Sequence, residues 1–274
     1  MPRARIELVD GKSILTRTSG YLAGFTHSLQ PYAGCQFSCA YCYVRELAVQ
    51  RTNRFGLPWS RWLLAKRNAP ELLARARYEH ARIFMSSATD PYTPIERELR
   101  ITRRCIQVFA ERAPRALIVQ TRSPLVVRDA EWIARIPRAA VSFTITTCDE
   151  RVRRLLEPDS PKFSRRVATL RALREAGVRV QVAVSPLLPG DVGELARAIS
   201  PWADRVVVDD FQRGDGAGGR RSRAALATLA AAGFEAWTRP GYAQDALARL
   251  RRELGAERVG ESQAGFSELD WLGC

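Results

Sequence analysis

Three cysteines stand close together near the start of the chain, at Cys35, Cys39 and Cys42. Their spacing, C-x3-C-x2-C, places three thiolates on one short loop, where they can take three corners of a cubane of iron and sulfide. The next cysteine along the chain is Cys105, too far in sequence to belong to the same loop. We therefore expect a cluster with one iron left open to a small chelating molecule, by the open-position logic that separates catalytic from structural zinc sites.

A zinc site is the first alternative, because zinc is also held by three cysteines and one histidine. His27, eight residues before Cys35, is the nearby candidate for the fourth ligand. Zinc loops usually present a C-x2-C pair and a second pair further along the chain. The spacing therefore favours the iron–sulfur cluster, with plain buried cysteines as the remaining alternative.

Short apolar strands alternate with helical patterns from residue 82 onward. These elements must position the loop that carries the three cysteines. Their repeated β–α order indicates parallel strands joined by right-handed crossovers, and the nearly all-apolar strands indicate a sheet covered by helices. With a less regular strand at 26–30, six such units predict an α/β fold of the incomplete (β/α)6 TIM-like barrel type. A doubly wound open sheet is the alternative, because periodicity does not reveal closure. The predicted strands are 82–86, 116–120, 140–145, 178–185 and 205–208, and the predicted helices are 95–112, 125–135, 149–156 and 164–176.

The chain length suits one hydrophobic core with small additions. We expect an N-terminal extension over 1–24, the partial barrel over 25–240, and a C-terminal helix and tail over 241–274 packed on the barrel. The glycine-rich, basic stretch Asp210–Arg223 is typical of a mobile loop. Asp209 and Asp210, which follow a predicted strand, are candidates for binding substrate hydroxyls or for ordinary turn chemistry.

The formal net charge of +14 is compatible with a polyanionic partner, because clustered cations gain from releasing counterions at phosphates. Arginine supplies 40 of the 43 basic residues, a bias that a GC-rich genome also produces. No run approaches the ~20 apolar residues of a membrane span. The N-terminus lacks the apolar stretch of a secretory signal. These features predict a cytoplasmic protein with no membrane partner.

The segments PYAGCQFSCAYCYVRE and SSATDPYTPIE carry a family resemblance. Over about residues 25–190 the chain resembles the radical S-adenosylmethionine (radical SAM) superfamily, in its spore photoproduct lyase-like, DNA repair photolyase-related branch. The resemblance implies a [4Fe-4S] cluster and S-adenosylmethionine (SAM) as cofactors, with a flavodoxin- or ferredoxin-type reductant. It implies that SAM is cleaved reductively to a 5′-deoxyadenosyl radical, which abstracts hydrogen from an unidentified substrate.

The resemblance also implies where the chain holds SAM, because barrel-type sheets gather their ligands at the carboxyl ends of the strands. Arg122 stands in a setting similar to that of a lysine that touches the SAM carboxylate in the lyase, and arginine can make this contact bidentately. For every implied contact, an ordinary polar residue at a strand end is the alternative. The other implied contacts are Tyr41 and Ser185 to the adenine, Ser86, Ser87 and Thr89 to the amino group, and Thr146 to the ribose.

The lyase also has hydrogen-donating residues, and here the sequence departs from it. Tyr41 and Tyr43 match a tyrosine pair proposed to relay a hydrogen atom, but Ser87 falls where the lyase has its donor cysteine. A hydroxyl O–H is far harder to cleave than a thiol S–H, so Ser87 is no replacement. Cys148, at the end of the fourth predicted strand, is a candidate substitute, with a small buried core residue as the alternative. The sequence therefore does not imply thymine-dimer repair.

Two further functions stay open beside radical modification of a nucleic acid. The same chemistry could modify a peptide or a small metabolite, which predicts no salt-dependent binding of DNA or RNA. A metal-stabilised nucleic-acid-binding protein without catalysis is the non-enzyme alternative. The number and order of the β–α units disfavour it, because zinc-stapled binding modules are usually far smaller.

Overall fold

The computed structural model describes residues 4–210 and 223–273. The predicted loop at 210–223 therefore lies almost wholly outside the described residues. Among the helices that are described, none combines the length and the apolar character needed to cross a membrane.

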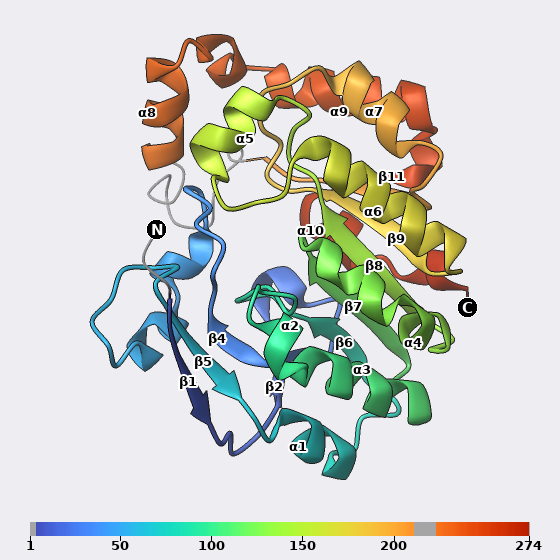
Figure 1. The fold of residues 1–274 in the computed structure, drawn as a ribbon. Helices are drawn as coiled ribbons and strands as arrows, with labels where there is room; N and C mark the ends of the chain where they lie inside the picture. The colour runs from blue at the N-terminus through green and yellow to red at the C-terminus, as the bar shows by residue number, and fades with distance from the viewer. Residues whose placement is uncertain (1–3, 211–222, 274) are drawn as a thin grey trace.

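The main sheet has eight strands in the order β11-β10-β9-β8-β7-β6-β3-β2. All neighbouring pairs are parallel except β2 and β3. Different strands stand at its two ends, so the sheet curves without closing into a barrel, which confirms the predicted incomplete barrel (Figure 1). The strands are β2 (Leu15–Arg17), β3 (His27–Leu29), β6 (Arg82–Met85), β7 (Ala116–Thr121), β8 (Ala139–Thr144), β9 (Arg179–Val184), β10 (Arg205–Val208) and β11 (Val259–Glu261).

Both ends of the chain contribute strands that were not predicted. A second sheet, in the order β1-β5-β4, joins β1 (Arg5–Val9) and β5 (Trp62–Lys66) in parallel and β5 and β4 (Tyr32–Gly34) antiparallel. The expected N-terminal extension thus supplies β1 to this sheet and β2 to the main one. The expected C-terminal tail supplies β11, so it completes the main sheet as well as packing on it. The domain boundaries themselves stay a prediction.

Helices cover the outer face of the main sheet, where α3, α4, α6, α7 and α9 lie in Figure 1. The predicted helix at 95–112 is divided at Arg100, whose φ of 52° is left-handed. Glu96 begins the first part, and its carboxylate accepts hydrogen bonds from the backbone N–H groups of Thr102 (2.9 Å) and Arg103 (3.2 Å). Glu96 therefore caps the second part. The helices are α1 (Ala69–Arg75), α2 (Glu96–Leu99), α3 (Ile101–Glu111), α4 (Ala130–Ala134), α5 (Glu150–Leu156), α6 (Phe163–Glu175), α7 (Val192–Ile199), α8 (Arg223–Ala231), α9 (Tyr242–Leu254) and α10 (Ser262–Ser267).

The two faces of the sheet carry different side chains, because successive residues of a strand point to opposite sides. The outer face is lined by large aliphatic residues such as Val119, Val141 and Val182, which pack under the helices. The inner face mixes the small residues Ala140 and Ala183 with the larger Phe84 and Ile118. These small side chains leave room inside the curve of the sheet for the C-terminal segment, which packs there through Phe266 and Leu272.

The N-terminal segment meets α10 on this inner side. A Cβ atom at Gly24 would lie 2.4 Å from the Cβ of Ser267, so only glycine allows this approach. Gln263 Nε2 also donates to the carbonyl oxygen of Gly20 at 2.7 Å. The two ends of the chain thus together form one side of the space above the sheet.

Candidate functional site

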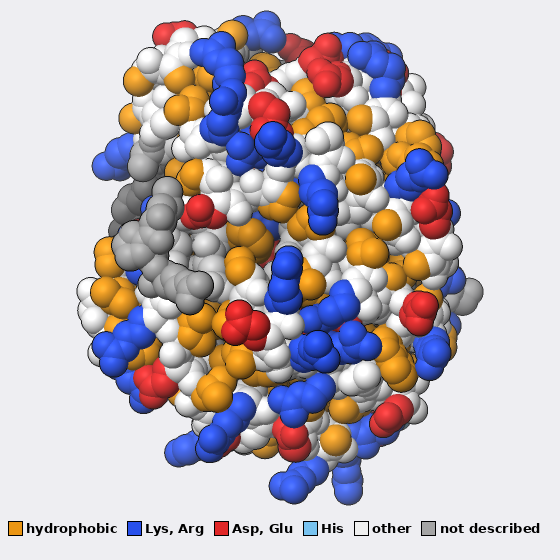
Figure 2. All heavy atoms as spheres, viewed as in Figure 1, with side chains coloured by type: hydrophobic (Ala, Val, Ile, Leu, Met, Phe, Trp, Pro, Cys, Tyr) orange, Lys and Arg blue, Asp and Glu red, His pale blue; other side chains and the backbone are white. Residues whose placement is uncertain are grey.

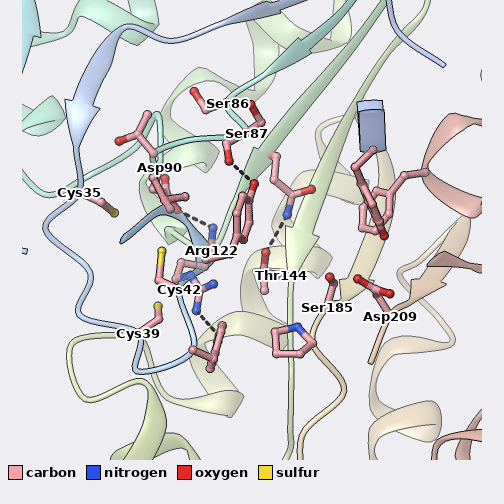
Figure 3. A pocket seen from close by; sticks show the side chains of 18 of the residues that line it. Cys35, Cys39, Cys42, Ser86, Ser87, Asp90, Arg122, Thr144, Ser185 and Asp209 are labelled. Atoms are coloured by element: carbon pink, nitrogen blue, oxygen red, sulfur yellow. Dashed lines mark hydrogen bonds between the residues drawn. The ribbon is translucent and has the colours of Figure 1, made fainter. Parts of the chain in front are cut away.

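A cavity of about 750 Å³ lies at the carboxyl ends of the parallel strands (Figure 3). This volume falls within the usual range for small-molecule and cofactor sites. Its walls are the cysteine loop, the ends of β6 to β10, the N-terminal residues 20–22 and the start of α10. Segments far apart in the sequence thus enclose one space.

Cys35, Cys39 and Cys42 all line this cavity, in which Figure 3 shows their sulfur atoms on one side. The loop follows Gly34, whose φ of +85° and whose approach to the carbonyl oxygen of Trp62 leave no room for a Cβ. Arg45 Nη2 donates to the carbonyl oxygen of Cys39 at 2.8 Å, which fixes the loop from its other side.

The three sulfurs fit an iron–sulfur cluster better than the predicted zinc alternative. His27, the candidate fourth zinc ligand, begins β3 and is not among the residues that line the cavity. Burial raises the pKa of all three thiols, that of Cys39 to about 11, so binding iron must displace their protons. Among the described residues, no three histidine, cysteine or acidic side chains lie close enough to hold a single metal ion.

A buried network centred on Glu157 lies beneath the cysteine loop. Arg122 Nη1 donates to Glu157 Oε1 at 2.7 Å and to the hydroxyl of Tyr41 at 2.9 Å, and Tyr41 in turn donates to Glu157. Arg166 donates to the other oxygen of this carboxylate. Burial raises the pKa of Glu157, but Arg166 and Arg122 outweigh it and lower the value to about 2. Glu157 is thus an anion that holds Arg122 and Tyr41 in place.

Asp90 holds the backbone that carries Arg122. Its carboxylate accepts from the backbone N–H of Tyr92 (2.9 Å), the hydroxyl of Thr121 (2.6 Å) and the backbone N–H of Arg122 (2.9 Å). Burial raises the pKa of Asp90, and these hydrogen bonds oppose the rise. Asp90 therefore joins the end of β6 to the end of β7.

Ser86, Ser87 and Thr89 follow β6 and line the cavity, as predicted for the end of this strand. Thr89 donates its hydroxyl proton to the carbonyl oxygen of Gly34, and Tyr43 donates to that of Ser87. These bonds join the end of β6 to the cysteine loop just before Cys35 and just after Cys42. Tyr41, Tyr43, Arg122 and Ser185 also line the cavity, while the cofactor contacts implied for all these residues stay predictions.

Thr146 does not lie where the sequence placed it. It follows the end of β8, is buried, and donates its hydroxyl proton to Glu157 Oε1 at 2.8 Å. Thr144, the last residue of β8, lines the cavity in its place and accepts from Gln120 Nε2 at 2.7 Å (Figure 3). The difference comes from where the strand ends: β8 stops at Thr144, so strand alternation no longer sets the side-chain direction two residues later.

Cys148 is also outside the cavity, contrary to its predicted position on the same face. Its thiol donates to the carbonyl oxygen of Asp191 at 3.2 Å, in a separate small depression beside Leu187 and Gly190. After β8 the chain turns to begin α5 at Glu150, and this turn carries Cys148 away from the strand ends.

On the side of the cavity away from the cysteines, the sequence indicated Ser185, Asp209 and Asp210, and the other residues were missed. Asp209 is the centre of this side. Burial raises the pKa of its carboxyl group, and the neighbouring hydroxyls of Ser262 and Tyr21 oppose the rise. Phe266 packs beside Tyr21, with ring centroids 5.9 Å apart. We define the distal wall as Asp209, Tyr21, Ser262 and Phe266. Tyr21 and Ser262 stand more than 200 residues apart in the chain, so no local pattern could signal their meeting.

Two buried polar atoms on the cavity residues have no partner in the described part of the chain. They are Gln120 Oε1 and Trp59 Nε1. Buried polar atoms are rarely left without a hydrogen bond, so these two atoms are exceptions in the wall of the cavity.

Comparison with known proteins identifies the family. A sequence model of the radical SAM superfamily matches residues 29–199. An uncharacterised protein of Methanocaldococcus jannaschii is 30% identical over 186 residues, which cover 68% of this chain and 70% of that protein. A radical SAM Nα-GlyT isomerase of Pseudomonas phage M6 is 26% identical over 60% of this chain, but only 33% of that protein is covered.

Solved structures share the fold at low sequence identity. Spore photoproduct lyase complexed with dinucleoside spore photoproduct superposes with a TM-score of 0.65 at 14% identity, covering 94% of this chain and 81% of that one. A variant of the lyase with bound AdoMet and the same dinucleoside gives 0.63 at 15% identity, over the same shares of the two chains. Members of the matched superfamily are enzymes whose radical chemistry depends on SAM, and the family implies a [4Fe-4S] cluster. The predicted resemblance is confirmed, and this chain belongs to the radical SAM superfamily.

Proposed function

We propose that this chain uses a cluster held by Cys35, Cys39 and Cys42 to cleave SAM, and that the resulting radical acts on a nucleic acid. The observation that carries the proposal is that these three cysteines and the polar strand ends line a single cavity. When bound, the cluster and SAM would supply an electron and a 5′-deoxyadenosyl radical able to take hydrogen from a substrate.

Arg122 is suited to hold the carboxylate of SAM. It lines the cavity, and in the described part of the chain every hydrogen bond of its side chain leaves from Nη1. The remaining N–H groups of the guanidinium are then available to a carboxylate. Since Glu157 already fixes one edge of the guanidinium, little side-chain freedom is lost on binding.

The other residues of the cavity orient the cofactor and shield the radical. Ser86 and Thr89 stand where an amino group would be held, and Phe37 and Trp59 add apolar surface that excludes water. Tyr41 and Tyr43 both line the cavity, and each is fixed by a hydrogen bond, to Glu157 and to the Ser87 carbonyl respectively. This arrangement supports a role for the two tyrosines in hydrogen-atom transfer.

The net charge and the fold motivate a nucleic-acid substrate. Figure 2 shows Lys and Arg side chains spread over the viewed face, with a gathering over α2 and α3. Such a surface attracts a polyanion. The lyase whose fold this chain shares has been solved with a dinucleoside in place, which makes a nucleic acid the first substrate to test.

Anaerobic reconstitution tests the proposal. Protein treated with iron and sulfide should turn brown, hold about four irons per chain, and release 5′-deoxyadenosine when reduced with SAM present. Replacement of all three clustered cysteines by alanine should abolish the colour and the product together. Colourless protein that holds one zinc, or brown protein that never cleaves SAM, would overturn the proposal.

Binding to DNA and RNA tests the substrate class. A nucleic-acid substrate predicts affinity that falls steeply with salt concentration, because phosphate contacts release counterions. Equal, salt-independent and weak binding of all oligonucleotides would instead favour a peptide or metabolite substrate.

A further inference from the structure

The charge inside the cavity is opposite to the charge of the chain. The chain carries a formal net charge of +14, yet among the described lining residues Arg122 is the only basic one, against the acids Asp90, Asp209 and Asp210. At the end near the cysteines, Asp90 accepts the backbone N–H of Arg122, and the guanidinium of Arg122 pairs with Glu157. The far end of the cavity therefore carries negative groups inside a positively charged protein.

The distal wall is a built surface. Asp209 lines the cavity together with Tyr21 and Ser262, and Figure 3 shows it beside Ser185, across the cavity from the cysteines. The ring of Phe266 packs against that of Tyr21, and Phe84 also lines the cavity. A carboxylate thus stands among aromatic side chains in the wall of the cavity.

The acidic and aromatic lining determines which part of a nucleic acid can enter the cavity. A phosphate is repelled by carboxylates, so the phosphates of a nucleic acid must stay on the basic exterior. A carboxylate has about four acceptor positions, so Asp209 can accept hydrogen bonds from a ligand. Aromatic walls and a hydrogen-bonding edge are the features by which enzymes hold a base taken out of its stack.

We propose that the distal wall binds one nucleobase, with Asp209 accepting hydrogen bonds from its amino-bearing edge and guanine preferred. Guanine presents a ring N–H beside an amino group, so it can give a carboxylate two parallel hydrogen bonds, as a guanidinium does. Thymine has one ring N–H between two carbonyl oxygens that repel the carboxylate. Asp209 is then a specificity-determining residue. This inference rests on the proposed nucleic-acid function and names the part of the nucleic acid that the site recognises.

A cationic amine is the other class that an acidic cavity could attract. The net charge of +14 argues against it, because the exterior repels cations before they reach the cavity. An amine also makes no use of the flat walls of Tyr21 and Phe266.

Short single-stranded DNAs test the inference with the reconstituted enzyme under anaerobic conditions. The probes are thymine oligomers with one central guanine, cytosine, adenine or thymine, and the readout is the dissociation constant from fluorescence anisotropy. We expect the guanine probe to bind about tenfold more tightly than the all-thymine probe, the discrimination of one good bidentate pair. Asp209→Asn should remove most of this difference, because the guanine probe loses its carboxylate partner and the thymine probe loses the repulsion.

Asp245→Asn, an exposed acid of α9 paired with Arg239, is the matched control and should keep the full preference. Iron content and thermal unfolding verify that each variant folds. If Asp209→Asn does not fold, Tyr21→Phe and Ser262→Ala serve instead, because each removes a hydroxyl that influences Asp209 without changing its charge; each should reduce the preference.

The outcomes separate this inference from the proposed function. Equal affinity for all four probes, or a preference that survives Asp209→Asn, overturns the inference, while SAM cleavage and salt-dependent DNA binding would still support the function. Competition by spermidine at low concentration, with no preference among bases, also overturns it and assigns the cavity to a cationic substrate. Absence of iron and of 5′-deoxyadenosine would instead defeat the function itself.

Discussion

Arg122 and Glu157 form an ion pair beneath the cysteine loop, with Nη1 of the arginine 2.7 Å from Oε1 of the glutamate. The glutamate side chain is fully buried and that of the arginine is 13% exposed. The same carboxylate accepts from Tyr41, Thr146 and Arg166, so every oxygen position is used. The pair therefore links the cluster loop to the ends of β7 and β8 through one fixed anion.

The segment after α5 holds the cysteine loop at two further points. The backbone N–H of Ala40 donates to the carbonyl oxygen of Leu156 at 2.8 Å, and the hydroxyl of Ser38 donates to Asp159. Together with the bond from Tyr41 to Glu157, these contacts fix both sides of Cys39. The position of the middle cysteine thus depends on residues about 120 positions later in the chain.

Glu157→Gln should destabilise the metal-free protein by about 3–5 kcal/mol, because it leaves buried Arg122 and Arg166 without their anion. Urea unfolding measures the loss. The matched control is Glu175→Gln, whose partner Arg171 is 62% exposed, and which should change stability by less than about 0.5 kcal/mol. Equal small effects for the two variants would contradict the role given to Glu157.

The same residue should make part of the stability depend on pH. The folded pKa of Glu157 is lowered from its usual value of 4.5 to about 2, so its contribution to stability is fully present above pH 4.5 and is lost as the pH falls towards 2. Urea midpoints of the metal-free protein should therefore fall over this window. Glu157→Gln should fall less steeply, since it has no carboxylate to protonate. Parallel curves for the two proteins would refute the assignment.

Arg122→Lys should weaken SAM binding to the reconstituted protein by about tenfold, because a lysine cannot hold Glu157 and a second carboxylate with two separate edges. Equilibrium dialysis with SAM measures the change, and it needs no turnover. Arg171→Lys, on the exposed side of α6, provides the control and should bind SAM like the parent. Unchanged affinity in Arg122→Lys would show that the SAM carboxylate is held elsewhere.

The central strands could be predicted because each is a short apolar run followed by a helical pattern. β4 and β11 could not, since three residues are too few to show alternation. The second sheet joins β1 to β5 across more than fifty residues, and such a pairing leaves no local mark in the sequence. Local sequence patterns therefore predict the repeated β–α units, but they do not predict the short strands near the two ends of the chain.

The site divides in the same way. The spacing of Cys35, Cys39 and Cys42 is a local pattern, and the strand-end serines follow from the order of the strands. Glu157 gives no such signal, because it follows a helix and its role depends on ion pairs with Arg122 and Arg166. Distant contacts of this kind depend on the tertiary fold and are the part that sequence reasoning could not reach.

Cys148 lies outside the cavity, although the sequence predicted it at the strand ends as a candidate hydrogen donor. Burial, with the nearby charge of Glu194, raises the pKa of its thiol to about 11, so at neutral pH it should be alkylated slowly by iodoacetamide. Mass spectrometry of the labelled protein measures the rate. Since Cys148 lies outside the cavity, Cys148→Ala should also form 5′-deoxyadenosine at the rate of the parent. Loss of substrate turnover in this variant, with SAM cleavage and unfolding midpoint intact, would return Cys148 to the reaction and require the segment around Asp191 to move.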